Sequence, residues 1–135
     1  MAKTIASVCI VPMIIVLSGG CAALPETSGY TIPEQFRGHW SAEPQICGSG
    51  LDVQSVHITH DQFIQYEGAG QVRLVRSIGP RAVAFNARML HGEDHWPLNV
   101  EARLVNPGLM RLTIDSDEFE FNGLDLHRCE PTRLP

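Results

Sequence analysis

The strongest constraint on the fold of this chain is a series of short runs in which apolar and polar residues alternate, with turn residues about every ten positions. Alternation with a period of two is typical of a β-strand with one buried face, and residues 83–89 and 110–115 show it most clearly. From residue 32 onward, no run has the apolar spacing of a long amphipathic helix. Strands are expected at 53–58, 62–66, 72–78, 82–91, 98–105, 109–115, 118–121 and 124–129.

The residues between these runs indicate how the strands are connected. Segments 67–70, 78–81, 106–108, 115–117 and 122–123 carry the Gly, Pro, Asn, Asp and Ser residues of tight turns. Consecutive hairpins give an antiparallel meander, and about eight strands most simply close into a small barrel because closure removes exposed sheet edges. The predicted fold class is therefore all-β, a small antiparallel meander in a closed or flattened barrel, with a two-sheet sandwich as the alternative.

Length and charge limit the class of protein. The 135 residues, of which 44% are hydrophobic, suit one compact domain, which we place at residues 32–135. Ten basic and fifteen acidic residues give a formal net charge of −5. A nucleic-acid binder needs a clustered basic face, so no nucleic-acid partner is expected.

Residues 1–20 have the pattern of a secretory signal peptide. Lys3 is followed by an uncharged apolar run that ends at Leu17 and is interrupted by Pro12. This run is shorter than the ~20 residues of a comfortable membrane span, and small residues follow it, as a cleavage site requires. A retained anchor helix is the alternative.

Residues 17–21, Leu-Ser-Gly-Gly-Cys, resemble the lipobox of bacterial lipoproteins, although Ser18 stands where an aliphatic residue is usual. The resemblance implies that Cys21 is lipidated and becomes the first residue of the mature protein. Residues 21–31 would form this lipidated end and a flexible tether. The resemblance also implies that Ala22, the residue after the lipidated cysteine, favours the outer membrane. The lipid would be the contact with the membrane, and the domain would face the periplasm. An ordinary signal peptide with an incidental cysteine is the alternative.

The remaining cysteines are predicted to form one disulfide. Cys9 lies within the signal peptide and Cys21 is assigned to lipid, which leaves Cys47 and Cys129. Thiols pair in an oxidising compartment such as the periplasm. Two buried free thiols are the alternative, and a metal site is disfavoured because neither cysteine belongs to a C-x-x-C pair.

Residues 38–40, Gly-His-Trp, resemble the G-x-W motif at the first strand of lipocalin-like barrels. The resemblance implies that Trp40 closes one barrel end and that Arg128 covers it, so Gly38, Trp40 and Arg128 are candidate structural residues. Otherwise Trp40 is simply a core aromatic. The chain also resembles small proteobacterial lipoproteins that have an early Phe-Arg-Gly-x-Trp and two later cysteines, a resemblance that implies no activity.

Histidines are the candidate metal ligands. Residues 91–95, His-Gly-Glu-Asp-His, hold ligand types that suit Zn or Cu, but the spacing of His91 and His95 serves a metal best on a helix. A solvated hairpin tip is the preferred interpretation, so no metal site is predicted and these two remain the alternative. His57 and His60 would point to opposite faces of a strand.

No recognised catalytic arrangement is present, so we predict neither an enzyme nor a cofactor. Residues 48–50 lack the surrounding residues of a hydrolase nucleophile turn, and 115–120 lack the glycine of a calcium loop. Gly68 and Gly70 are too few for a phosphate-binding loop.

The leading functional expectation is a membrane-anchored periplasmic lipoprotein that acts as a non-enzymatic binding or envelope-maintenance module. Its partner would be a small apolar ligand at the barrel mouth or a periplasmic protein. A periplasmic protein partner would bind to the hairpin loops of this chain around Arg73, Arg76, Glu93 and Trp96. An inhibitor of lysozyme or of a secreted protease is one alternative, and a periplasmic metal-binding protein is another.

Overall fold

The computed structural model describes residues 28–117 and 120–130. The predicted signal peptide, Cys21 and most of the expected tether lie outside these residues. The elements in chain order are β1 (Ser28–Gly29), η1 (Glu34–Phe36), β2 (Gly38–Ser41), η2 (Pro44–Ile46), β3 (Ser55–Ile58), β4 (Gln62–Gln65), β5 (Gly68–Gly79), β6 (Ala82–His91), β7 (Asp94–Asn106), β8 (Leu109–Asp115) and β9 (Glu120–Arg128). Within this part of the chain, no helix is long and apolar enough to cross a membrane.

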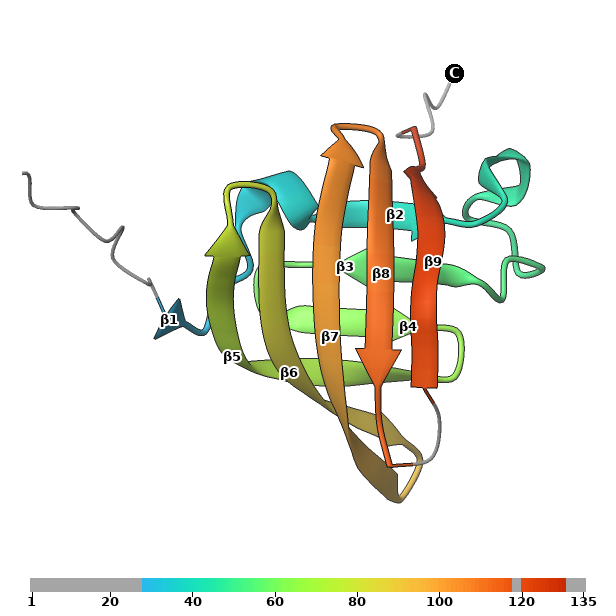
Figure 1. Cartoon of the computed structure of the whole chain (residues 1–135). Helices are drawn as coiled ribbons and strands as arrows, with labels where there is room; N and C mark the ends of the chain where they lie inside the picture. The colour runs from blue at the N-terminus through green and yellow to red at the C-terminus, as the bar shows by residue number, and fades with distance from the viewer. Residues whose placement is uncertain (1–27, 118–119, 131–135) are drawn as a thin grey trace, which may run out of the picture.

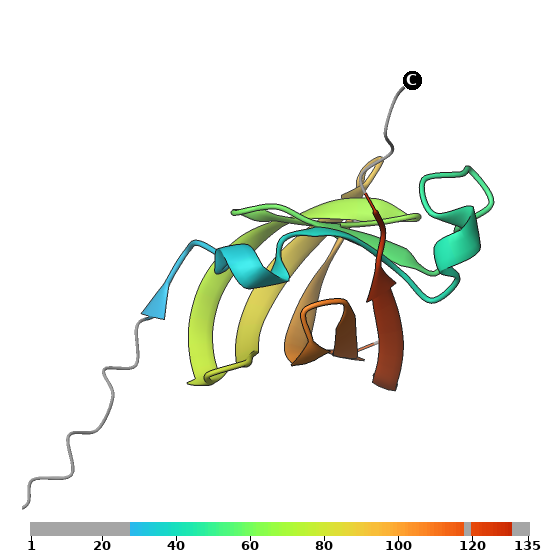
Figure 2. The same cartoon turned by 90° about the horizontal axis from the view of Figure 1, so that it is seen from above.

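Strands β2 to β9 form a closed antiparallel barrel. Each strand pairs with the next along the chain, and β9 returns to pair with β2 (Figure 1). Seen from above, β5 to β9 arch beneath the layer formed by β2, β3 and β4 (Figure 2). The prediction of an all-β meander of eight strands in a closed barrel is confirmed.

Strand β1 lies outside the barrel ring, on the edge of β5. Ser28 pairs with Arg76 and Gly29 pairs with Val75. The end of the segment expected to be a flexible tether is therefore fixed to the barrel wall.

Several strand boundaries differ from the sequence prediction. Residues 120–121 and 124–128, which come from two expected strands, belong to the single strand β9, and the predicted turn at 122–123 lies inside it. Gly123 has φ +77°, and the pairing of β8 with β9 shifts register between Leu112 and Ile114. A β-bulge thus accommodates the turn-like residues without ending the strand. Residues 38–40, placed before the first strand, begin β2.

A further difference is the turn predicted at 67–70, where β5 already begins at Gly68. Gly70 is buried against β6. A Cβ atom there would collide with Met89 Sδ and lie 3.2 Å from the Arg88 carbonyl oxygen. This glycine permits close packing and is not a turn residue.

The core fills the barrel with the side chains that alternate inward. The two faces predicted from the sequence are buried: Val83, Phe85, Ala87 and Met89 on β6, and Met110, Leu112 and Ile114 on β8. Phe63 of β4 meets Phe85 edge to face, with ring centroids 5.6 Å apart. Strand alternation therefore directs the burial.

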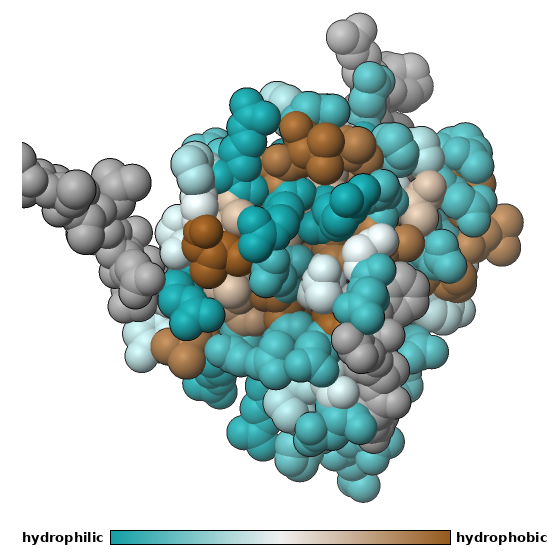
Figure 3. Space-filling view, viewed as in Figure 1, coloured by the Kyte–Doolittle hydropathy of each residue, from teal (hydrophilic) through white to brown (hydrophobic). Residues whose placement is uncertain are grey.

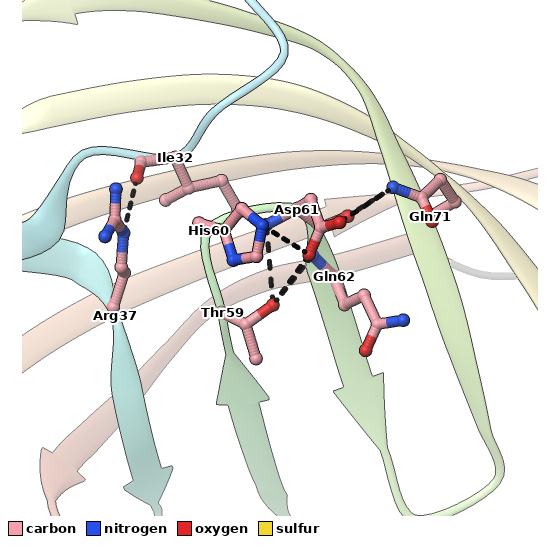
Figure 4. A network of polar contacts seen from close by, with 7 residues as sticks. All are labelled: Ile32, Arg37, Thr59, His60, Asp61, Gln62 and Gln71. Atoms are coloured by element: carbon pink, nitrogen blue, oxygen red, sulfur yellow. Dashed lines mark hydrogen bonds and ion pairs between the residues drawn. The ribbon is translucent and has the colours of Figure 1, made fainter.

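Ile32, just before η1, is held at one barrel end by backbone contacts. Its N–H donates to the His60 carbonyl oxygen at 2.8 Å, and its own carbonyl oxygen accepts from Arg37 Nε at 2.8 Å. The Asp61 carbonyl oxygen accepts from Gln71 Nε2 at 3.0 Å, which links the β3–β4 turn to β5 (Figure 4). These bonds fasten the segment before β2 across the barrel end.

The predicted disulfide between Cys47 and Cys129 is confirmed, with Cα atoms 5.8 Å apart and a sequence separation of 82. It joins the end of η2 to the residue that follows β9. The Cys129 N–H also donates to the His39 carbonyl oxygen at 2.8 Å. The disulfide and this hydrogen bond therefore hold the end of β9 against β2 and the segment that follows it.

Candidate functional site

One end of the barrel is sealed by aromatic and aliphatic side chains. Ile32, Phe36 and Trp40 have exposed fractions of 0%, 1% and 0%. Trp40 Nε1 donates to the Phe36 carbonyl oxygen at 3.0 Å, so its only polar atom is satisfied inside the protein. Trp40 therefore presents no surface to a ligand at this end.

Arg128 covers Trp40 from β9. Its guanidinium carbon lies 4.1 Å from the Trp40 ring centroid, within the range of a cation–π contact. Its nitrogens donate to three carbonyl oxygens: those of Arg37 at 2.6 Å, Gln35 at 2.8 Å and Pro107 at 3.1 Å. Burial lowers the pKa of Arg128, but a guanidinium keeps its proton in proteins. The charge therefore serves to hold the segment before β2 in place.

Gly38 completes this closed end. Its φ is +124°, and a Cβ atom there would lie 2.8 Å from Arg128 Nη1. A larger residue would meet both backbone strain and a clash with the covering arginine. The structure thus brings together the three candidate structural residues Gly38, Trp40 and Arg128.

An apolar groove lies where β8 and β9 face β3 and β4, and it encloses about 340 Å³. Its lining comes from β3, β4, β8, β9 and the segment before β3: Val53, Gln54, Ser55, Val56, Gln65, Leu112, Ile114 and Leu124.

The lining of the groove is apolar at its base, and three of its other residues have polar uncharged side chains: Gln54, Ser55 and Gln65. Val56, Leu112 and Ile114 are buried, Leu124 is half-buried, and Val53 is 58% exposed at the rim. The lining residues include hydrogen-bonding side chains but no charged one. Ligand sites of this kind combine apolar walls with a few polar groups, and ~300–1,000 Å³ is their usual size. The groove therefore suits a small apolar molecule better than an ion.

A second hollow lies on the outer wall of β5 to β8. It encloses about 510 Å³, and its lining includes apolar side chains together with the polar side chains of Arg76, Asn86, Asn99 and Glu101. Asn86 Nδ2 donates to Asn99 Oδ1, and Glu101 pairs with Arg103 at 2.6 Å. Figure 3 shows this wall as a mixture of hydrophilic and hydrophobic residues. Because charged side chains such as Arg76 and Glu101 line this hollow, it suits a small apolar molecule less well than the groove does.

The four residues expected to form a protein-binding surface are not gathered into one. Arg76 lines the outer-wall hollow, whereas Arg73 lines a different one. Glu93 lies at the exposed tip of the β6–β7 hairpin, and Trp96 is half-buried against the core.

The alternative metal ligands His91 and His95 do not face each other. His91 pairs with Asp94, and His95 pairs with Leu90 at the next position of the β6–β7 ladder. Directly opposed residues share a face and successive positions alternate, so the two imidazoles lie on opposite faces of the hairpin. Among residues 28–117 and 120–130, no group of three or more His, Cys, Asp or Glu could hold a metal.

His57 and His60 are likewise separated. His60 lies in the β3–β4 turn, where its Nε2 is 3.4 Å from Asp61 Oδ1. His57 instead stacks on His39, a pair that sequence reasoning missed because it depends on the register of β2 with β3.

The groove and the closed end are described from the structure of this chain, and no known protein guides their interpretation. Comparison of the chain with protein-family models, with curated proteins and with solved structures finds no match.

Proposed function

We propose that this chain is a non-enzymatic binding module of the bacterial envelope, held at a membrane by a lipid on Cys21, and that its barrel takes a small apolar ligand. The observation that carries the proposal is the groove between β3, β4, β8 and β9, which has an apolar base and no charged side chain in its lining. Trp40 and Arg128 close one end of the barrel, so the groove is the better candidate for a ligand.

The sequence supports the membrane anchor. Cys21 stands at the end of a lipobox-like segment, and two or three acyl chains hold a protein stably on a bilayer. The chain between Cys21 and β1 reaches at most about 25 Å when fully extended. Because β1 is paired to the wall of the barrel, this short reach would keep the groove near the membrane surface.

The lining of the groove indicates the ligand class. Val56, Leu112 and Ile114 offer apolar contact at the base, whereas Gln54 and Gln65 offer hydrogen bonds. Burial of a charged group without a partner is strongly unfavourable. The ligand we propose is therefore a single-chain lipid or a similar molecule, with its apolar part in the groove and its polar part at the rim.

A fluorescence titration with N-phenyl-1-naphthylamine, which brightens in apolar surroundings, tests this function. We would use residues 22–135, so that no membrane competes for the probe. The protein should bind the probe, and Val53→Glu should weaken binding at least fivefold because it places a carboxylate at an apolar rim. Val53 is 58% exposed, so the substitution should leave the fold intact.

Val105→Glu is the matched control. Val105 is 49% exposed, lies near the last residue of β7 and is not part of the groove lining. This variant should bind the probe as the parent does. Failure of the parent to bind, or an equal loss in both variants, would contradict an apolar binding site in the groove.

A further inference from the structure

A pair of histidines on the outer wall of the barrel has no role in the groove. His39 of β2 lies directly opposite His57 of β3. The two imidazole rings are stacked, with centroids 5.8 Å apart and an angle of 27° between their planes. His57 is exposed and His39 is half-buried, so solvent reaches the pair.

The separation of the rings is close to what one metal ion requires. Imidazole nitrogens bind at about 2.0–2.1 Å from a metal, so two nitrogens on one ion lie about 3 Å apart. Ring centroids lie farther from the metal than the nitrogens do. Rotation of the two side chains out of the stack would bring one nitrogen of each ring onto a shared ion, with the strands in their present register.

The backbone beneath the pair is held in place. The residues that flank it on the inner side, Trp40 and Ile58, are 0% and 1% exposed. The His39 carbonyl oxygen accepts from the Cys129 N–H at 2.8 Å, next to the disulfide. A chelating pair on a rigid ladder loses little conformational freedom when it binds, which favours affinity.

The charges around His39 also permit a cation. A hollow of about 350 Å³ adjoins this side chain and is lined by Glu130 as well as by Arg128. The Arg128 guanidinium is engaged with three carbonyl oxygens and the Trp40 ring at the sealed end. Glu130 is exposed and supplies a negative charge on the same hollow.

The number of ligands selects the metal. Structural zinc sites use four protein ligands, whereas the described residues contain no group of three or more suitable side chains. Imidazole suits copper, Cu²⁺ binds most tightly among the divalent first-row ions, and its tetragonal sites accept nitrogen together with oxygen ligands. Two imidazoles with water in the remaining positions fit Cu²⁺ best.

We propose that His39 and His57 form a Cu²⁺-binding site on the outer wall of the barrel, formed by the register of β2 and β3. The site is separate from the apolar groove and does not depend on the function proposed for it.

Copper titration of the full-length chain in detergent micelles tests the site. Every sample carries Cys9→Ser and Cys21→Ser, because free thiols also bind copper. We expect one tight Cu²⁺ per chain, with electron paramagnetic resonance showing two imidazole nitrogens as ligands. His57→Gln should weaken binding at least tenfold, and His39→Gln with His57→Gln should be little weaker than either single variant, because one loss already breaks the chelate.

His60→Gln is the matched control, since His60 is an exposed histidine only three residues from His57. It should bind copper as the parent does. The proposal is overturned if the parent binds no copper, if His57→Gln binds as tightly as the parent, or if His60→Gln loses as much affinity. His57 is exposed, so its variant should retain the circular dichroism spectrum of the parent and report binding alone.

Discussion

Replacing both Cys47 and Cys129 by serine should lower the free energy of unfolding by about 4.5 kcal/mol, because the disulfide closes a loop with a sequence separation of 82. In the chain-entropy account, the bond stabilises the fold by restricting the unfolded chain. It also ties the residue after η2 to the residue after β9, close to the pairing of β2 with β9 that closes the barrel. Urea unfolding of residues 22–135 measures the effect as a lower midpoint concentration.

Reduction of the parent protein provides the control for this prediction. Dithiothreitol should lower the midpoint of the parent toward that of the double-serine variant and should leave the variant unchanged. A loss below ~1 kcal/mol would contradict the prediction, because the entropy of so long a loop would then have little effect on stability.

Trp40→Ala should lower the free energy of unfolding by about 3–5 kcal/mol, the usual loss when a buried tryptophan is truncated. The side chain is fully buried, donates to the Phe36 carbonyl oxygen at 3.0 Å and supports Arg128 at 4.1 Å. Truncation would leave a cavity at the sealed end and would remove the surface on which the guanidinium rests. Urea unfolding followed by circular dichroism measures the loss.

Trp96→Ala is the matched control, because Trp96 is only half-buried. It should lower stability less than Trp40→Ala does. If Trp40→Ala leaves too little folded protein to measure, Trp40→Phe keeps an aromatic ring and removes the hydrogen bond to Phe36, which contributes about 1 kcal/mol. An equal loss from both alanine variants would contradict a special role for Trp40 in sealing the barrel.

The alternation of apolar residues was sufficient to predict the barrel, because each strand has one face in a single core. It was insufficient where the chain departs from regular alternation. Gly123 lies in a bulge, so the pattern indicated two strands where β9 is one. The strand expected at 98–105 begins earlier, at Asp94, and includes Pro97, which lies in the part of β7 that pairs with β6 alone before β8 joins at Asn99. A proline is tolerated there because that side of the strand needs no donor.

The candidate sites were predicted less completely than the fold. The G-x-W resemblance identified Trp40 and Arg128, which meet although they are far apart in the chain. The stack of His39 on His57 and the apolar groove depend on strand register and barrel closure, which no local pattern specifies. Ser41 and Asp52 are a further example, because this buried pair joins β2 to a loop through a bond of 2.9 Å.

The assignment of the cysteines underlies both the proposed location and the oxidised barrel, and intact mass spectrometry tests it most directly. The full-length chain would be expressed in a bacterial envelope and extracted from the membrane. We predict a mature protein that begins at Cys21, carries three acyl chains and has lost two hydrogens to the Cys47–Cys129 bond. A protein that is cleaved without lipid, or one that retains residues 1–20, would contradict the anchor and with it the proposed envelope function.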